Sequence, residues 1–176
     1  ISVPGGVVRA YDIRTGDLIW YWDPLPPGLE PIIDEEGQQL YQRGTTNVWS
    51  IISTDPELNL IYLPTGNTAA DNYGGHRNGS DYYSSSVVAL DASSGEVVWH
   101  FQTVHHDIWD YDLAMGPKLL TVNRNGRAVD AVALAGKHGF LFVFDRETGE
   151  PLFEIEERAV PASDVPGESA SPTQPW

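Results

Sequence analysis

The stretch Ala89-Leu90-Asp91-Ala92-Ser93-Ser94-Gly95-Glu96-Val97-Val98-Trp99 decides the fold of this chain. An apolar run leads into Asp91, whose side chain can hydrogen-bond the backbone of a tight turn, and Gly95 allows the positive φ that such a turn requires. A second β-like run then carries a large aromatic residue, Trp99. This order of residues is typical of a β-hairpin.

The same pattern, Asp followed by Gly four residues later and a large aromatic residue four residues after that, occurs two more times. The other copies are residues 10–20 and residues 143–153. Self-similar hairpins indicate a repeat architecture. We expect the three repeat aromatics, Trp20, Trp99 and Phe153, to be packing residues only.

Further short β-like runs lie between the repeats, at residues 48–52, 60–63 and 131–134. No window has a convincing helical period, and 17 Gly with 13 Pro fit many tight turns, so the predicted class is all-β. The repeat aspartates lie 79 and 54 residues apart, more than the roughly 40–45 residues of a compact propeller blade. We therefore expect long loops, chiefly at residues 24–44 and 71–83.

The amino-acid composition argues against some classes of binding partner. Lys and Arg number 10 against 25 Asp and Glu, and the net charge of -15 argues against nucleic acid or an anionic membrane surface as a partner. The absence of Cys excludes disulfides and a thiolate metal site within the chain. Neither end resembles a natural terminus, so we expect the chain to be a segment of a longer protein.

Residues 105–112, His-His-Asp-Ile-Trp-Asp-Tyr-Asp, concentrate three carboxylates and two imidazoles in eight positions. Carboxylates this close repel one another unless a cation, a metal ion or a hydrogen-bond donor lies nearby, and Lys137 is a candidate cation. Adjacent histidines in a strand point to opposite faces, so we do not expect His105 and His106 to share a zinc ion.

Each candidate also has a purely structural explanation. Asp110 could brace a turn, Lys137 could be an ordinary loop cation, and Trp49 lies in an apolar run where a core role is common. Asn67 follows Gly66 and is a frequent turn residue. The pair His76-Arg77 is expected on a solvated, Gly-rich loop.

Several segments, in order along the chain, resemble the pyrroloquinoline-quinone (PQQ)-dependent dehydrogenases, above all the membrane-bound glucose dehydrogenase branch. The matching segments are Gly74-Gly75-His76-Arg77, Tyr83-Ser84-Ser85-Ser86, residues 101–110 and Ser171-Pro172-Thr173-Gln174-Pro175-Trp176, together with the three hairpins, which resemble that family's tryptophan-docking repeat. The resemblance implies an eight-bladed β-propeller. Residues 1–176 would form a fragment of that single propeller domain, with about three of its blades.

The resemblance also assigns roles to single residues. Asp110 would be the catalytic base that removes the proton of the substrate hydroxyl while hydride passes to the quinone. Lys137 would hydrogen-bond the quinone oxygens, and Trp49 would form the flat floor beneath the cofactor ring.

For the metal, the resemblance implies Asn67, Asp110 and Asp112 as oxygen ligands of a Ca²⁺ ion bound with PQQ, with Mg²⁺ or a lanthanide as alternatives. Thr68 would take part in cofactor binding. It lies beside Ala69, the position at which the sugar-oxidising branch uses Thr.

The implied function is oxidation of a hydroxyl of a glucose-like sugar, a polyol or an alcohol, with electrons passing to ubiquinone or cytochrome c. The implied location is the periplasm, with a membrane tether in the parent protein. The isolated segment is expected to lack activity, and to self-associate or require the missing blades. Two alternatives stay open: a non-catalytic propeller scaffold of the cell envelope, and a glycoside hydrolase that uses Asp107 and Asp110.

Overall fold

A computed structural model describes residues 5–30, 32–37, 39–40, 46–77 and 79–176. These residues form β-strands joined by turns and loops, with one short 3₁₀ helix, η1 (Gly74–His76). Within the described ranges no helix is long and apolar enough to cross a membrane. The all-β class predicted from the sequence is confirmed.

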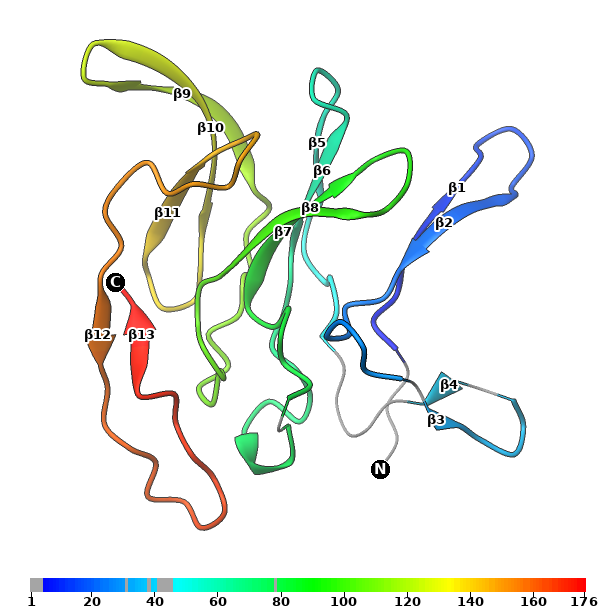
Figure 1. The fold of residues 1–176 in the computed structure, drawn as a ribbon, viewed down its shortest axis with the longest axis vertical. Helices are drawn as coiled ribbons and strands as arrows, with labels where there is room; N and C mark the ends of the chain where they lie inside the picture. Colours follow the sequence, from blue (N-terminus) through cyan, green and yellow to red (C-terminus); the bar gives the residue numbers. More distant parts are fainter. Residues whose placement is uncertain (1–4, 31, 38, 41–45, 78) are drawn as a thin grey trace.

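Three twisted sheets stand side by side (Figure 1). The central sheet has four strands in the order β5-β6-β7-β8, flanked by the pair β1-β2 and by the three-stranded sheet β11-β10-β9. Their bounds are β1 (Val8–Tyr11), β2 (Leu18–Trp22), β5 (Ser53–Asp55), β6 (Leu60–Pro64), β7 (Ser86–Asp91), β8 (Val97–Gln102), β9 (Lys118–Arg124), β10 (Arg127–Ala135) and β11 (Leu141–Asp145).

Two small antiparallel pairs complete the described elements. They are β3 (Ile32–Ile33) with β4 (Gln39–Leu40), and β12 (Glu157–Ala159) with β13 (Thr173–Pro175). All strand pairs are antiparallel and join neighbours along the chain. This meander of successive sheets is a partial β-propeller, as expected.

Strand β7 is buried on both faces and divides the core into two clusters. Val87 and Ala89 pack toward the third sheet, together with Val132, Phe142 and other residues. Val88 and Leu90 point the other way, into a cluster that includes Trp22. Since successive side chains of a strand point to opposite faces, a continuous apolar run suits a blade enclosed by neighbours on both sides.

The repeat aromatics join one repeat to the turn of the next. Trp20 donates its Nε1–H to the carbonyl of Ala92 at 2.9 Å, and a Cβ added to Gly95 would lie 2.6 Å from the Trp20 ring. Trp99 repeats this contact on Gly149, where an added Cβ would lie 2.5 Å from the Trp99 ring. The glycines therefore provide both a positive φ and the space for an indole, and the packing role predicted for Trp20 and Trp99 is confirmed. The third repeat aromatic, Phe153, departs from that prediction: it is 49% exposed, and the Arg124 guanidinium lies 4.7 Å from the centroid of its ring.

Two expectations about strands are wrong in detail. Residues 48–52 form no regular strand. Two of their side chains bind the loop 103–117: Trp49 Nε1 donates to Asp112 Oδ2 at 3.0 Å, and Ser50 Oγ donates to the carbonyl of Ala114 at 2.8 Å. The third repeat lacks a regular second strand. Only Pro151 bridges to Phe144, and a proline has no N–H with which to extend the ladder.

The docking contact predicts a difference between two equivalent glycines. Gly16 has φ +78° with nothing within 4 Å of an added Cβ, whereas Gly95 has φ +76° and faces the Trp20 ring. Gly16→Ala should lower the free energy of unfolding by about 1 kcal/mol through backbone strain alone. Gly95→Ala should cost about 1–3 kcal/mol more because it displaces an indole. Urea unfolding of both variants measures the difference, and equal losses would contradict tryptophan docking.

Candidate active site

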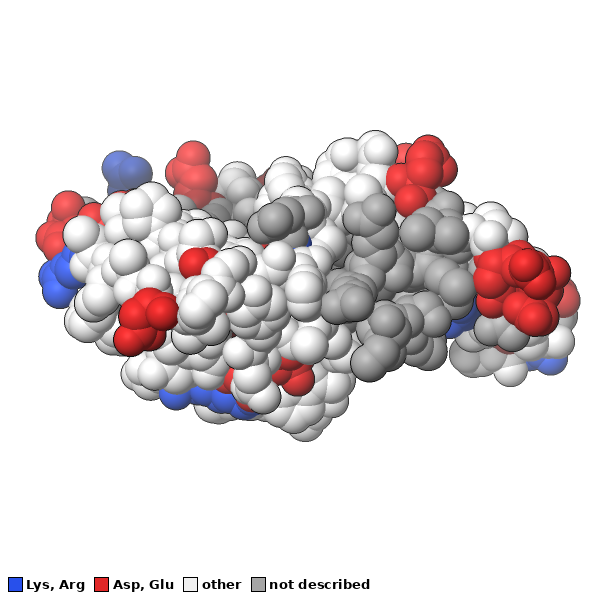
Figure 2. All heavy atoms as spheres, turned by 90° about the horizontal axis from the view of Figure 1, so that it is seen from below, with Lys and Arg blue, Asp and Glu red and all other residues white. Residues whose placement is uncertain are grey.

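Four of the residues singled out from the sequence meet at the end of the sheets that lies below in Figure 1, opposite the hairpin turns of the repeats. Trp49 lies shortly before β5, Asp110 and Asp112 lie in the loop that follows β8, and Lys137 lies in the turn that follows β10. Figure 2 views the molecule from this end and shows acidic side chains at several places on it. The sheets thus bring together residues that are far apart in the chain.

Lys137 bridges two carboxylates. Its Nζ lies 3.0 Å from Asp110 Oδ2 and 2.7 Å from Asp112 Oδ1. The hydrogen bond with Asp112, and then that with Asp110, raises the pKa of Lys137 above its ordinary value. The ammonium form is therefore favoured, and a single cation serves both carboxylates.

Trp49 belongs to the same cluster. Its Nε1–H donates to Asp112 Oδ2 at 3.0 Å, and Lys137 Nζ lies 5.5 Å from the centroid of its ring. A Cβ added to Gly66 would lie 2.8 Å from the indole, so only glycine leaves room for the ring there. The side chain remains 52% exposed, and a flat aromatic surface is thus accessible next to the Lys137 ammonium.

The loop that carries Asp110 is fixed by Asp107, which is fully buried. Asp107 Oδ1 accepts a hydrogen bond from the Trp109 amide at 3.0 Å, and Oδ2 accepts one from Ser85 Oγ at 2.7 Å. Asp110 has φ +60°, a left-handed conformation that is uncommon outside glycine and least unfavourable for Asp and Asn. Its side chain is 38% exposed and so can be reached from solvent.

Asn67 lies in a buried network beside the first cluster. Its Nδ2 donates to the carbonyls of Asp71 and Asp107, at 3.2 and 2.9 Å. Its Oδ1 accepts hydrogen bonds from Arg77 Nη1 at 2.6 Å and Ser84 Oγ at 3.2 Å. All four hydrogen-bonding positions of the amide are therefore in use.

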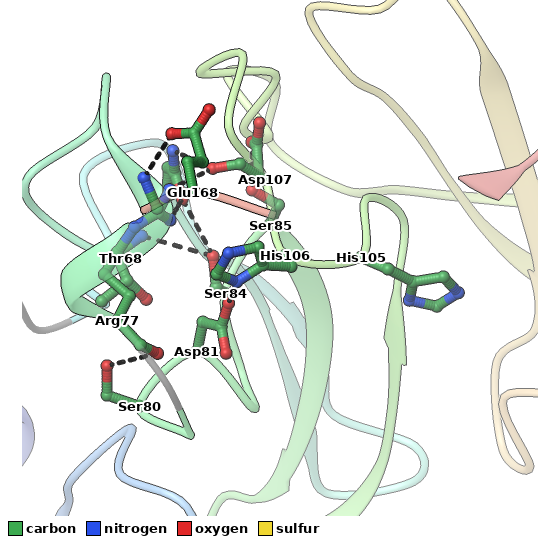
Figure 3. A network of polar contacts seen from close by, with 12 residues as sticks. Thr68, Arg77, Ser80, Asp81, Ser84, Ser85, His105, His106, Asp107 and Glu168 are labelled. Carbon is green, nitrogen blue, oxygen red and sulfur yellow. Dashed lines mark hydrogen bonds and ion pairs between the residues drawn. The ribbon is translucent and has the colours of Figure 1, made fainter. Parts of the chain in front are cut away.

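Thr68, the next residue, is also fully buried, and its hydroxyl lies 2.7 Å from that of Thr46. Thr68 Oγ1 therefore has a protein partner. Figure 3 shows Thr68 in the surroundings of Arg77 and Ser84.

The two histidines point apart, as expected, although they lie in a turn and not in a strand (Figure 3). His106 Nδ1 lies 2.6 Å from Asp81 Oδ2, whereas His105 Nε2 lies 3.0 Å from Glu157 Oε1. The expectation that Arg77 lies on a solvated loop is wrong, because Arg77 is fully buried. Its partners come from segments 10 and 30 residues away, which no local pattern reveals.

Sequence reasoning missed Asp71, which lies in the long loop before β7. Burial, followed by the charges of Asp110 and Asp112, raises the pKa of its carboxyl group. Lys137 and Arg77 oppose that shift but do not cancel it. Three carboxylates, those of Asp71, Asp110 and Asp112, thus interact with two cations, Arg77 and Lys137, and this arrangement of charges favours a further cation or a proton at the site.

The donor chemistry suits a hard divalent cation, since carboxylate and amide oxygens are the preferred ligands of Ca²⁺. Within the described ranges, however, no three His, Asp or Glu side chains converge closely enough to hold a metal ion. The residues expected to bind the quinone suit that role better than the expected metal ligands suit theirs. The accessible indole face of Trp49 lies beside the ammonium group of Lys137.

Comparison with known proteins shows the family to which the chain belongs. The sequence model of the glucose/ethanol/alcohol dehydrogenase β-propeller domain, the PQQ family, matches residues 1–176. The chain belongs to this family of PQQ-dependent dehydrogenases.

Among curated relatives, the chain is 42% identical over 176 residues to a quinate/shikimate dehydrogenase (quinone) of Acinetobacter baylyi, covering 99% of the chain and 22% of the relative. It is 38% identical over 172 residues to the quinoprotein glucose dehydrogenase of Escherichia coli, covering 97% and 21%. The chain thus spans about a fifth of the length of these relatives.

Solved structures agree with this fold. The chain superimposes on a quinohemoprotein alcohol dehydrogenase, ADHIIG, of Pseudomonas putida HK5 with a TM-score of 0.72 at 30% identity, covering 92% of the chain and 26% of that structure. A europium-containing methanol dehydrogenase gives a TM-score of 0.69 at 25% identity, covering 97% and 34%. The partial propeller is therefore confirmed as a quinoprotein propeller fold.

The excess negative charge predicts the effect of neutralising Asp71. Its raised pKa means that the folded chain binds a proton at this carboxyl more readily than the unfolded chain, so the ionised form costs stability at neutral pH. In the metal-free protein, Asp71→Asn should raise the free energy of unfolding at pH 7, and the gain should vanish as pH falls below the ordinary carboxyl pKa of about 4. Urea unfolding at several pH values measures this.

The exposed residue Asp17 provides a matched control for that substitution. Asp17→Asn should leave the free energy of unfolding almost unchanged at pH 7. A loss of stability in Asp71→Asn at pH 7 would contradict the charge imbalance.

Proposed function

We propose that this chain supplies the base, the ring floor and the basic contact of a PQQ-dependent dehydrogenase active site that oxidises a hydroxyl group of a sugar or another polyol. The observation that carries the proposal is the cluster in which Lys137 bridges Asp110 and Asp112 beside the exposed face of Trp49. A scaffold protein has no need for such an arrangement, and a glycoside hydrolase has no required place for the lysine and the indole.

Asp110 is the base. In the reaction, its carboxylate accepts the proton of the substrate O–H as the C–H bond breaks, and the substrate becomes a carbonyl compound. The side chain is 38% exposed, and its rigid loop fixes the direction from which a hydroxyl can approach. A base positioned in this way contributes about 10²–10⁴ in rate.

Lys137 and Trp49 bind the cofactor in this proposal. Bound PQQ would supply the two-electron acceptor for the hydride. The flat indole face offers stacking area to a conjugated ring, and the ammonium group can donate a hydrogen bond to a quinone oxygen. Thr68, whose hydroxyl pairs with that of Thr46, would support the cofactor from the buried layer beside this cluster.

We further propose that Asp110, Asp112 and Asn67 provide oxygen ligands for a Ca²⁺ ion, or for Mg²⁺ or a lanthanide in its place. The charge imbalance at Asp71 supports binding of a cation. Asn67 could join such a shell only by exchanging one of the two donors on its Oδ1, Arg77 or Ser84. Asp110, whose side chain is 38% exposed, is therefore the most accessible of the three, whereas Asp112 is buried and its two oxygens face Lys137 and Trp49.

The substrate class follows from the names of the relatives, which include quinate/shikimate, glucose and glycerol dehydrogenases. A polyhydroxylated carbon skeleton is common to these substrates, and a glucose-like sugar remains the favoured substrate. We propose that the electrons pass to ubiquinone or cytochrome c, and that the protein works in the periplasm, tethered to the membrane outside this chain.

Dye-linked oxidation of sugars and polyols by the protein that carries this chain, with and without PQQ and Ca²⁺, tests the proposal. Turnover should require PQQ, and Asp110→Asn should lower kcat by about 10²–10⁴ while the quinone stays bound. Asp17→Asn, far from the site, should retain the full rate. Full activity in Asp110→Asn would exclude this base, and failure to bind PQQ would favour the non-catalytic propeller.

A further inference from the structure

Arg77 is among the largest fully buried side chains of the described residues, which is unusual for a cation. Burial lowers the pKa of the guanidinium, and the carboxylates of Asp81, Asp107, Asp71 and Glu168 oppose this shift. A buried charge is costly unless hydrogen bonds compensate it. The hydrogen bonds of Arg77 therefore indicate what its burial achieves.

Both terminal nitrogens of Arg77 bind oxygens of residues next to the candidate active site. Nη1 donates to Asn67 Oδ1 and Nη2 donates to the carbonyl of Asp107, each at 2.6 Å. Asn67 Nδ2 also donates to the Asp107 carbonyl, at 2.9 Å, which closes a triangle of three residues. A planar guanidinium can reach two oxygens on different segments at once, whereas the single ammonium group of a lysine lacks this fork geometry.

The backbone around Arg77 is itself fixed. Its amide donates to the carbonyl of Gly74 at 3.0 Å, and its own carbonyl accepts the Ser80 amide at 3.0 Å. The amide of Gly74 in turn donates to Glu168 Oε2 at 2.7 Å. The guanidinium thus extends from an anchored turn.

Asp107 is held from both sides as a result. Arg77 and Asn67 fix its carbonyl, while Ser85 and the Trp109 amide fix its carboxylate. Asp110 follows three residues later in a left-handed conformation, which persists only where the surroundings determine it.

We propose that Arg77 is a positioning residue for the base. By fixing the Asp107 carbonyl and the Asn67 amide, it holds the loop so that the Asp110 carboxylate lies against Lys137 and faces the substrate hydroxyl. This inference rests on the proposed function of Asp110. Arg77 is buried and would not contact substrate or cofactor. It would increase the rate of oxidation indirectly, through the position of Asp110.

Arg77→Lys in the protein that carries this chain tests the inference. The substitution keeps the positive charge but removes the planar guanidinium, whose two terminal nitrogens bind different segments. We expect kcat to fall by about 10-fold or more, since displacement of a base by about 1 Å has effects of this order or larger. KM and the bound quinone, measured by absorbance, should stay within about two-fold of the parent values. Arg146→Lys, which removes the fork of a guanidinium bound to Asp55 and Glu57 away from the site, should keep the full rate.

A double-mutant cycle distinguishes a positioning role of Arg77 from a general loss of structure. If Arg77 acts through Asp110, then Arg77→Lys added to Asp110→Asn should cause no further loss of rate. Independent losses that multiply would overturn the inference, as would an unchanged kcat in Arg77→Lys. Full activity in Asp110→Asn alone would instead overturn the proposed function.

Ser85→Ala provides a second test that leaves the buried charge in place, and it decides the matter if Arg77→Lys does not fold. It removes the hydrogen bond to Asp107 Oδ2 and so releases the same segment from the opposite side. We expect a lower kcat with quinone still bound, and again no further loss in the Asp110→Asn background. An unchanged kcat, or losses that multiply, would overturn the inference.

Discussion

The Lys137 ammonium between Asp110 and Asp112 is the interaction on which the rest of the site depends. Without it, two like charges would face each other beside a third, Asp71, and the loop after β8 would lose both of its ion pairs with the turn after β10. Both partners of the Asp110 pair are more than a third exposed, so water and salt screen it and it adds little to global stability. Its contribution is geometric, because it joins two sheets at the point where the chemistry is proposed.

That geometry is useful only if the sheets themselves are fixed, which the docked tryptophans achieve. Trp20 and Trp99 each close against the turn of the following repeat, over a glycine that leaves space for the ring. The doubly buried strand β7 then couples the central sheet to both of its neighbours. Loops at one end of the sheets can therefore carry strained residues such as Asp110 without losing their positions, since the framework is rigid.

The hairpin repeats and the all-β class were predictable from the sequence because turn chemistry is local: Asp and Gly at fixed spacing encode each turn. The cluster at Lys137 was predictable through the family resemblance and the density of acids at residues 105–112. The burial of Arg77 and the raised pKa of Asp71 were not predictable, since their partners lie on distant segments that only the folded chain brings together. The predicted strand at residues 48–52 was wrong for a related reason. The segment is apolar, but Trp49 donates to Asp112, and no strand of the described residues pairs with residues 48–52.

We propose that the exposed face of Trp49, beside Lys137, receives the quinone. A fluorescence titration of the metal-loaded protein with PQQ tests it most directly, comparing Trp49→Phe with Trp176→Phe, a substitution of another half-exposed indole. We expect PQQ to quench part of the tryptophan emission, Trp49→Phe to lose most of this quenching, and Trp176→Phe to keep it. Quenching that is the same in both variants, or PQQ binding that Trp49→Phe leaves unchanged in affinity, would contradict the claim.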